Sequence, residues 1–166
     1  MITTDNTEVT KKELSIDPRV IHAECFGLSL RRAARATARR YDEALRPIDL
    51  TLGQFGTLVM LAELQAVSMH ALAELLTMDR TTLTAALKPL QRRALVAVRP
   101  DKSDRRSRNV TLTDRGVTLL RSAIPLWKKV QGRIGLEMGT AGLPIFRAQL
   151  VLLSAARDAE SSPESS

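Results

Sequence analysis

The 166-residue sequence predicts a mainly α-helical protein with one small β-hairpin. Three observations support this prediction. Apolar residues recur at three-to-four spacing through segments 17–46, 51–65, 68–76 and 79–93, which is the period of an amphipathic helix. Two short stretches, 96–99 and 109–112, alternate apolar and polar residues as strands do. The segment between these two stretches is rich in charge, so it is expected to be the loop that joins them.

The first half of the chain contains clear helix start signals. Asp17 followed by Pro18 predicts the start of a helix, because aspartate caps a helix and proline is tolerated at its first position. Pro47 predicts its end near residue 46. Thr51 and Gln54 match a capping box, which predicts a second helix. Its core positions are predicted to be Phe55, Leu58, Val59, Leu61 and Ala62.

Residues 68–95 predict two helices joined by a tight turn. Ser68 is the expected cap of the shorter helix, and spacing places Leu72, Leu75 and Leu76 in the core. The longer helix has an apolar stripe made of Leu83, Leu87, Leu90 and Ala94.

The opposite face of the longer helix has small side chains, hydroxyls and cations, and no acid after Asp79. Short side chains permit close approach to base edges, and hydroxyls and cations suit phosphates. Ordinary solvent-exposed faces usually mix glutamate with lysine, so this composition favours a helix that enters the major groove of DNA. The candidate DNA-binding residues here are Arg80, Thr81, Thr82, Thr84, Ala85 and Lys88.

The loop of the hairpin is strongly basic, with five cations against two acids in residues 99–108. A loop this basic is poorly explained as part of a core. The negative potential of a minor groove attracts arginine, which makes Arg105 or Arg106 the expected insertion. Asp104 is expected to hold a neighbouring arginine in position, and Lys102 is a further DNA-binding candidate.

The C-terminal third predicts further helices. Thr113 caps one of them and Asp114 matches its dipole. Glycines at 132, 135, 139 and 142 are expected to interrupt it before a closing apolar helix at 143–156. Terminal helices this apolar need a partner, and a second copy of the chain is the economical one, because DNA-binding dimers read two half-sites related by two-fold symmetry.

Composition narrows the class of protein. The net charge of +7 favours polyanionic partners, with nucleic acid and an anionic membrane surface both open on charge alone. One cysteine, the absence of a signal-peptide pattern, and no apolar run of ~20 residues predict a soluble, cytoplasmic protein without a membrane partner. No phosphate-binding loop, nucleophile elbow or metal-ligand cluster is present, so neither an enzyme, a cofactor nor a metal is expected.

The chain order gives the expected domain organisation. Residues 1–16 form a flexible arm, 17–49 an N-terminal dimerisation helix, 50–114 a winged helix-turn-helix DNA-binding domain, 115–158 C-terminal dimerisation helices, and 159–166 a disordered tail.

The residues 79–84 (Asp-Arg-Thr-Thr-Leu-Thr), 104–106 (Asp-Arg-Arg) and 110–113 (Val-Thr-Leu-Thr) resemble the MarR family of winged helix-turn-helix regulators, over roughly residues 22–156. The resemblance implies a homodimer that binds double-stranded DNA at a palindromic operator. It further implies a repressor, relieved by a small-molecule effector or an oxidant, with Asp104 and Arg106 as the wing pair and Arg106 in the minor groove.

The chain departs from the family pattern in ways that leave alternatives open. Ala85 and Ala86 stand where close relatives have Arg-Asn, and Ala94 replaces a glycine suited to positive φ. Cys25-Phe-Gly-Leu followed by Tyr41 resembles the start of peroxide-sensing members, which keeps a thiol-based sensor using Cys25 as an alternative. The spacing from Cys25 to Tyr41 is two residues longer than in those members, which places the thiol on another helical face. A weakly specific architectural DNA-binding protein is a further alternative. A reversible effector pocket is expected between the first two helices and the DNA-binding unit. Its candidates, each also explicable as core, are His22, Phe26, Phe55 and Met60.

Overall fold

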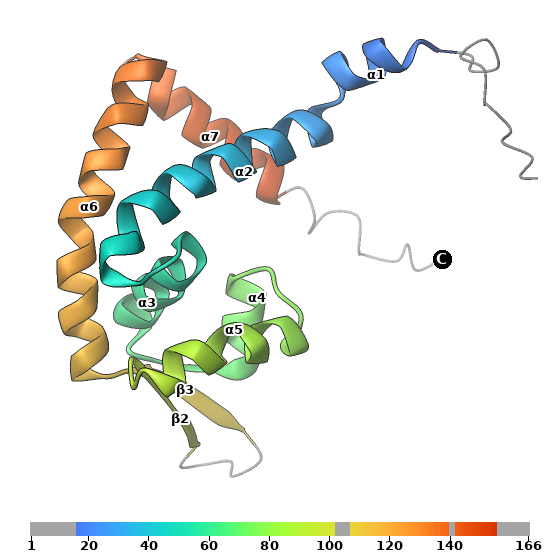
Figure 1. Cartoon of the computed structure of the whole chain (residues 1–166). Coiled ribbons are helices and arrows are strands. Elements are labelled where there is room, and N and C mark those ends of the chain that lie inside the picture. The colour runs from blue at the N-terminus through green and yellow to red at the C-terminus, as the bar shows by residue number, and fades with distance from the viewer. Residues whose placement is uncertain (1–15, 102–106, 140–141, 156–166) are drawn as a thin grey trace, which may run out of the picture. The chain divides into compact units, whose positions relative to one another are not determined.

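The computed structural model describes residues 16–101, 107–139 and 142–155 (Figure 1). It divides the chain into two compact units, with the boundary between Arg40 and Tyr41. The described part is mainly helical with a small three-stranded antiparallel sheet. The predicted fold class is therefore confirmed.

The N-terminal unit contains α1 (Pro18–Glu24) and most of α2 (Phe26–Leu45). Asp17 caps α1 as predicted, because its carboxylate accepts the N–H of Arg19 at 2.8 Å. The hydrogen bonds from the Arg19 side chain and backbone lower the pKa of Asp17 below its ordinary value. The prediction of one continuous helix was wrong at Cys25, whose extended backbone (φ −69°, ψ 110°) separates α1 from α2.

The second unit begins with the last turn of α2. After it come the 3₁₀ turn η2 (Arg46–Ile48), α3 (Leu52–Leu64), β1 (Ala66–Ser68), α4 (Met69–Leu75) and α5 (Arg80–Arg92). The chain continues with β2 (Val96–Pro100), β3 (Arg108–Leu112), α6 (Asp114–Met138) and α7 (Gly142–Ala155). The predicted caps of α3, α4 and α6 are confirmed, with Thr51, Ser68 and Thr113 each accepting a backbone N–H of the first turn.

The sheet has the strand order β1-β3-β2, and both pairings are antiparallel. β2 and β3 form the predicted hairpin, in which Val98 lies opposite Val110. β1 was not predicted from the sequence. It adds to the other side of β3 and places Val67 opposite the same Val110, which is fully buried.

The core of the second unit contains a large set of buried leucines from α2, α3, α4, α5 and the α5–β2 connection: Leu45, Leu58, Leu61, Leu72, Leu83, Leu87, Leu90 and Leu95. Four predicted core positions were wrong. Val59 and Leu75 are 38% and 48% exposed, and Ala62 and Ala94 are also exposed. On α3 the buried stripe includes Thr57 instead, whose hydroxyl donates to the carbonyl of Gly53 at 3.0 Å.

α6 is longer than predicted. It runs through Pro125, Gly132 and Gly135 and ends at Gly139, where φ is +74°. At Gly135 a Cβ would lie 3.3 Å from Leu143 of α7, so a small residue there permits close approach of the two helices. No helix in the described ranges has both the length and the apolar composition to cross a membrane.

Gly116, in the first turn of α6, provides a test of this packing. A Cβ there would lie 2.2 Å from the carbonyl oxygen of Leu95 and 2.6 Å from Leu112. Gly116→Ala is therefore expected to lower the free energy of unfolding by about 1–3 kcal/mol or more, because backbone must move. Gly56→Ala is the matched control, since no atom lies within 4 Å of its Cβ position inside α3. It should stabilise the protein by about 0.5–1 kcal/mol. Urea unfolding followed by circular dichroism, at one protein concentration, measures both; equal effects would contradict the packing.

Candidate nucleic-acid interface

α4 and α5 form the predicted helix-turn-helix. The turn is tight: the N–H of Thr77 donates to Glu74 at 2.9 Å, and the N–H of Met78 donates to Ala73 at 2.8 Å. Thr77 adopts a positive φ of 52°, a conformation that costs free energy for a β-branched residue. The packing of the two helices therefore holds this turn against its local preference.

Asp79 fixes the start of α5. Its carboxylate accepts the N–H of Thr82 at 2.8 Å and the hydroxyl of Thr82 at 2.6 Å. These two bonds, the hydroxyl first, lower the pKa of Asp79 below its ordinary value. A lowered pKa means that this carboxylate stabilises the fold above the pKa of the unfolded chain, and that the contribution is lost as pH falls through the folded value.

The two faces of α5 differ as the sequence predicted. Leu83, Leu87 and Leu90 are almost completely buried. Side chains on the other side are exposed, and they include all six DNA-binding candidates of this helix: Arg80, Thr81, Thr82, Thr84, Ala85 and Lys88. The hydroxyl of Thr84 donates to the carbonyl of Arg80 at 2.7 Å, which leaves its oxygen free to accept. The helix continues through Pro89.

A cleft of about 420 Å³ lies beside the start of α5, between α4, α5 and β3. Arg80 from α5 and Arg108 from β3 both line it, together with His70 of α4. The imidazole of His70 lies 3.4 Å from the carboxylate of Glu74. The two arginines suit a phosphate of the DNA backbone, and the carboxylate of Glu74 is the one acid in the lining of this cleft.

His70, Ser107 and Arg108 are the candidates that sequence reasoning missed. Arg108 was counted among the basic residues of the loop but was not selected, and His70 was interpreted as surface or core. Only the packing of β3 beside α4 brings these residues to Arg80. No local pattern in the sequence contains that information.

The predicted wing residues Lys102, Asp104, Arg105 and Arg106 lie outside the described residues, so their roles stay predictions. The end of β2 and the start of β3, which flank this segment, are held together by hydrogen bonds. The N–H of Asp101 donates to the carbonyl of Ser107 at 2.9 Å, and the side-chain amide of Asn109 donates to Asp101 at 2.5 Å.

The candidates for effector binding and redox chemistry are distributed over both units. Phe55 is buried and stacks on Trp127 of α6 with ring centroids 6.5 Å apart, and Met60 packs at the edge of the same core. His22 and Phe26 belong to the N-terminal unit, where Phe26 is 82% exposed. Cys25 is a free, half-buried thiol between α1 and α2. These sites stay predictions. The described residues contain no group of three or more side chains that could hold a metal ion.

The helix-turn-helix formed by α4 and α5, followed by the antiparallel hairpin of β2 and β3, defines a winged helix-turn-helix protein. A model of the MarR family matches residues 50–107 of this chain. The transcriptional repressor NicR of Pseudomonas putida is 35% identical over 108 residues, which cover 64% of this chain and 68% of NicR. The organic hydroperoxide resistance transcriptional regulator of Bacillus subtilis is 27% identical over 94 residues, covering 57% of this chain and 64% of the regulator.

Among solved structures, the transcriptional regulator MosR of M. tuberculosis in complex with DNA has a TM-score of 0.75 and 36% sequence identity. The match covers 84% of this chain and 100% of MosR. The chain therefore belongs to the MarR family of DNA-binding transcriptional regulators. These relatives are transcriptional regulators and not enzymes, which confirms the prediction that this chain is not an enzyme.

Proposed function

We propose that this chain is a homodimeric, cytoplasmic transcriptional repressor that binds a palindromic operator and is released from it by a small-molecule effector. The observation that supports this most is the exposed face of α5, whose hydroxyls and cations stand beside the basic cleft at β3. NicR, the 35% identical relative, is named a repressor, and MosR has been crystallised with DNA.

The geometry of α5 suits the major groove. A helix of 13 residues is ~20 Å long, and it fits a groove that is ~12 Å wide when its exposed side chains are short. Thr81, Thr84 and Ala85 are short, and the methyl of Ala85 can contact a thymine methyl. Arg80 and Arg108 then bind backbone phosphates on the side of the cleft, and Lys102, Asp104, Arg105 and Arg106 serve the minor groove.

The terminal helices support the dimer. α7 exposes apolar side chains along most of its length, and Leu136 in the last turn of α6 is 83% exposed. Burying such a surface against a second copy removes it from water at ~25 cal/mol per Å². The exposed apolar residues of α7 are Ile145, Phe146, Leu150, Val151, Leu152 and Leu153. In this proposal segments 17–49 and 115–158 form the dimer, and 50–114 bind DNA, with 1–16 and 159–166 as flanking segments.

A second candidate function is a repressor released by oxidation of Cys25. The position of this residue favours the second candidate, because Cys25 separates α1 from α2. Its backbone carbonyl accepts the N–H of Ser29, in the first turn of α2, at 3.1 Å. A bulkier oxidised side chain there would disturb the start of α2. The 27% identical relative from Bacillus subtilis is named for resistance to organic hydroperoxides.

Salt titration of DNA binding tests the phosphate contacts. Arg80→Gln and Arg108→Gln should each weaken operator binding and reduce the slope of log K against log salt by ~1, because each removes one released counterion. Arg121→Gln, an exposed arginine of α6, is the matched control and should leave the slope unchanged. Unchanged slopes in all three would contradict the cleft as a phosphate site. An operator preference below ~10³ over random DNA would favour the architectural alternative.

Light scattering tests the dimer. Leu152→Glu introduces a charge on the exposed apolar face of α7, and should convert the dimer to an 18.3 kDa monomer. Operator affinity should fall by ~10²-fold or more, because the two half-sites are no longer bound together. Ser122→Glu, on an exposed part of α6, should remain dimeric. A wild-type protein that is monomeric at all concentrations would refute the proposed assembly.

A gel shift with an organic hydroperoxide separates the two candidate functions. If Cys25 is the sensor, the oxidant should release reduced wild-type protein from the operator and leave Cys25→Ser bound. Under the main proposal, both proteins stay bound. Release of both proteins would show damage elsewhere and would exclude Cys25 as the switch.

A further inference from the structure

The solvent-facing side of α6 carries only positive charge. From Arg115 to Leu136 the sequence contains no aspartate or glutamate. At ~100° per residue the charged side chains of this stretch fall within an arc of ~140°. The buried residues Ala123 and Val130 lie on the other side of the helix. We call the charged arc the basic face of α6; it consists of the exposed residues Arg115, Arg121, Lys128, Lys129 and Arg133.

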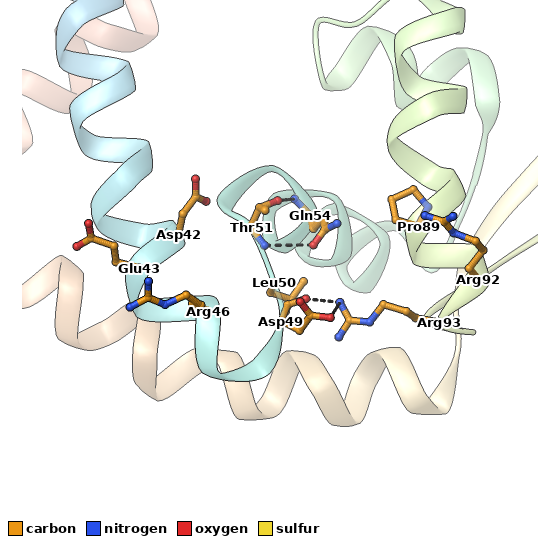
Figure 2. Close-up of a pocket in the computed structure, with 10 residues that line it drawn as sticks. All are labelled: Asp42, Glu43, Arg46, Asp49, Leu50, Thr51, Gln54, Pro89, Arg92 and Arg93. Atoms are coloured by element: carbon orange, nitrogen blue, oxygen red, sulfur yellow. Dashed lines mark hydrogen bonds and ion pairs between the residues drawn. The ribbon is translucent and has the colours of Figure 1, made fainter.

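The cations of the basic face have no partners among the described residues: none forms an ion pair or a side-chain hydrogen bond with one of them. Arg93 at the end of α5 differs in this respect, because it donates to the carbonyls of Ile48 and Asp49 and lies near the carboxylate of Asp49 (Figure 2). Like charges four residues apart on a helix, such as Lys129 and Arg133, repel each other. A polyanionic partner would remove that repulsion.

The proposed dimer does not account for the basic face. Charges that are removed from water need partners of opposite sign, or they cost free energy. The apolar side chains of α7 are the proposed dimer contact, and α7 contains no acid. A two-fold interface also brings the same surface of both copies together, so the basic face would meet cations of its own kind. The basic face therefore remains in solvent in the dimer.

Charge alone would suit either DNA or an anionic membrane, but the rest of α6 does not suit a membrane. A helix that lies on a membrane inserts an apolar stripe opposite its charged face. The apolar stripe of α6 is not available for insertion, because it packs against α3 and the core, with Ala123 buried and Trp127 partly buried. Apart from Ile124, the exposed neighbours of the cations are small or polar: Thr118, Ser122, Pro125 and Gly132.

A DNA duplex matches the basic face in charge and in length. From Arg115 to Arg133 the face extends ~27 Å along the helix axis. Duplex DNA carries one negative charge per ~1.7 Å of its own axis, so a row of cations this long can contact several phosphates without inserting any side chain. Contacts to phosphates carry no sequence information, and small neighbouring side chains permit close approach of the backbone.

We propose that the basic face of α6 binds the phosphate backbone of a second DNA duplex, without reading its sequence, while α5 holds the operator. α6 packs on α3 and η2, whereas α5 packs on α4 and β2, so the two exposed faces belong to different parts of the unit. Lys128 lies ~21 Å along the axis from Asp114, where α6 begins. The dimer then bridges two DNA segments. The bridging rests on the proposed function, but the affinity of α6 for duplex DNA does not.

The second duplex should bind as a non-specific partner does, with a dissociation constant of ~10⁻⁴–10⁻⁶ M at physiological salt. This contact is therefore absent when a dilute operator duplex is titrated alone. For that reason Arg121→Gln remains a silent control in the operator titration.

A capture assay tests the bridge. Operator duplex is fixed to beads, protein is bound, the excess is washed away, and labelled duplex of random sequence is added at micromolar concentration. Wild-type protein should retain the labelled duplex. Lys128→Gln/Lys129→Gln should keep operator binding and dimer mass but weaken capture at least about tenfold. It should also lower the slope of log K against log salt by ~2, because two released counterions are lost. Lys128→Arg/Lys129→Arg keeps the charge and should capture as wild type.

A matched pair on another helix separates the basic face from total charge. Arg31→Gln/Arg32→Gln removes two adjacent exposed cations of α2 and should retain capture. Equal loss in both double variants, or equal capture by wild type and Lys128→Gln/Lys129→Gln, would overturn the assignment to α6. So would the absence of capture at low salt, including the case in which wild type sediments with phosphatidylserine vesicles instead.

Failure of the proposed function gives a different result, because the protein then does not bind the operator beads at all. In that case the binding of free protein to the random-sequence duplex, compared between wild type and Lys128→Gln/Lys129→Gln, still tests the basic face. Weaker binding by the variant would support it, and equal binding would overturn it.

Discussion

The burial of three leucines on α5 is the constraint on which the proposed DNA-binding surface depends. Leu83, Leu87 and Leu90 are at most 1% exposed, and they hold α5 against α4 and β2. Because an α-helix repeats every ~3.6 residues, burying this stripe fixes the opposite face outward. The Thr81–Ala85–Lys88 face is therefore presented by packing, and it needs no contacts of its own to be positioned.

The C-terminal end of α5 is held by residues that are distant in the sequence. Arg93 donates to the carbonyls of Ile48, the last residue of η2, and of Asp49, which follows it. The hydroxyl of Thr113 donates to the carbonyls of Ala94 and Leu95 at 2.7 and 3.1 Å. Ala94 makes this junction with a φ of 53°, which confirms that an alanine occupies a position suited to glycine. The strain at Ala94 is tolerated because partners on both sides fix the backbone around it.

Features with a local cause could be predicted from the sequence. The caps at Asp17, Thr51 and Thr113 need only a side-chain oxygen within a few residues of the N–H it accepts. The β2–β3 hairpin follows from alternation in two short segments. The exposed face of α5, which contains every candidate that the structure describes on that helix, follows from helical period alone.

The rest depends on contacts between distant segments. β1 is only three residues long, and it is a strand because its partners in β3 lie more than 40 residues away. The glycines of α6 were interpreted as breaks, yet Gly135 remains helical where α7 packs closely. Leu75 has helical spacing, but α4 ends there and turns the side chain to solvent. Arg108 and His70 become neighbours of Arg80 only through the sheet.

The two ends of α5 are therefore bonded to different parts of the protein. Its start is fixed by the Asp79 cap and the short turn from α4, both within the helix-turn-helix itself. Its end is tied to η2 and to α6, and the last turn of α2 is tied to α6 in turn, since the hydroxyl of Tyr41 donates to Gln131. If the contact between α2 and α6 changed, we would expect the end of α5 to respond before its start, because only that end is bonded to η2 and to the cap of α6. Over the ~20 Å length of α5, a small tilt moves Lys88 and Arg92 much further than Arg80 and Thr81. In the proposed function, such a tilt would change the fit of α5 to the major groove while the buried leucine stripe stays in place.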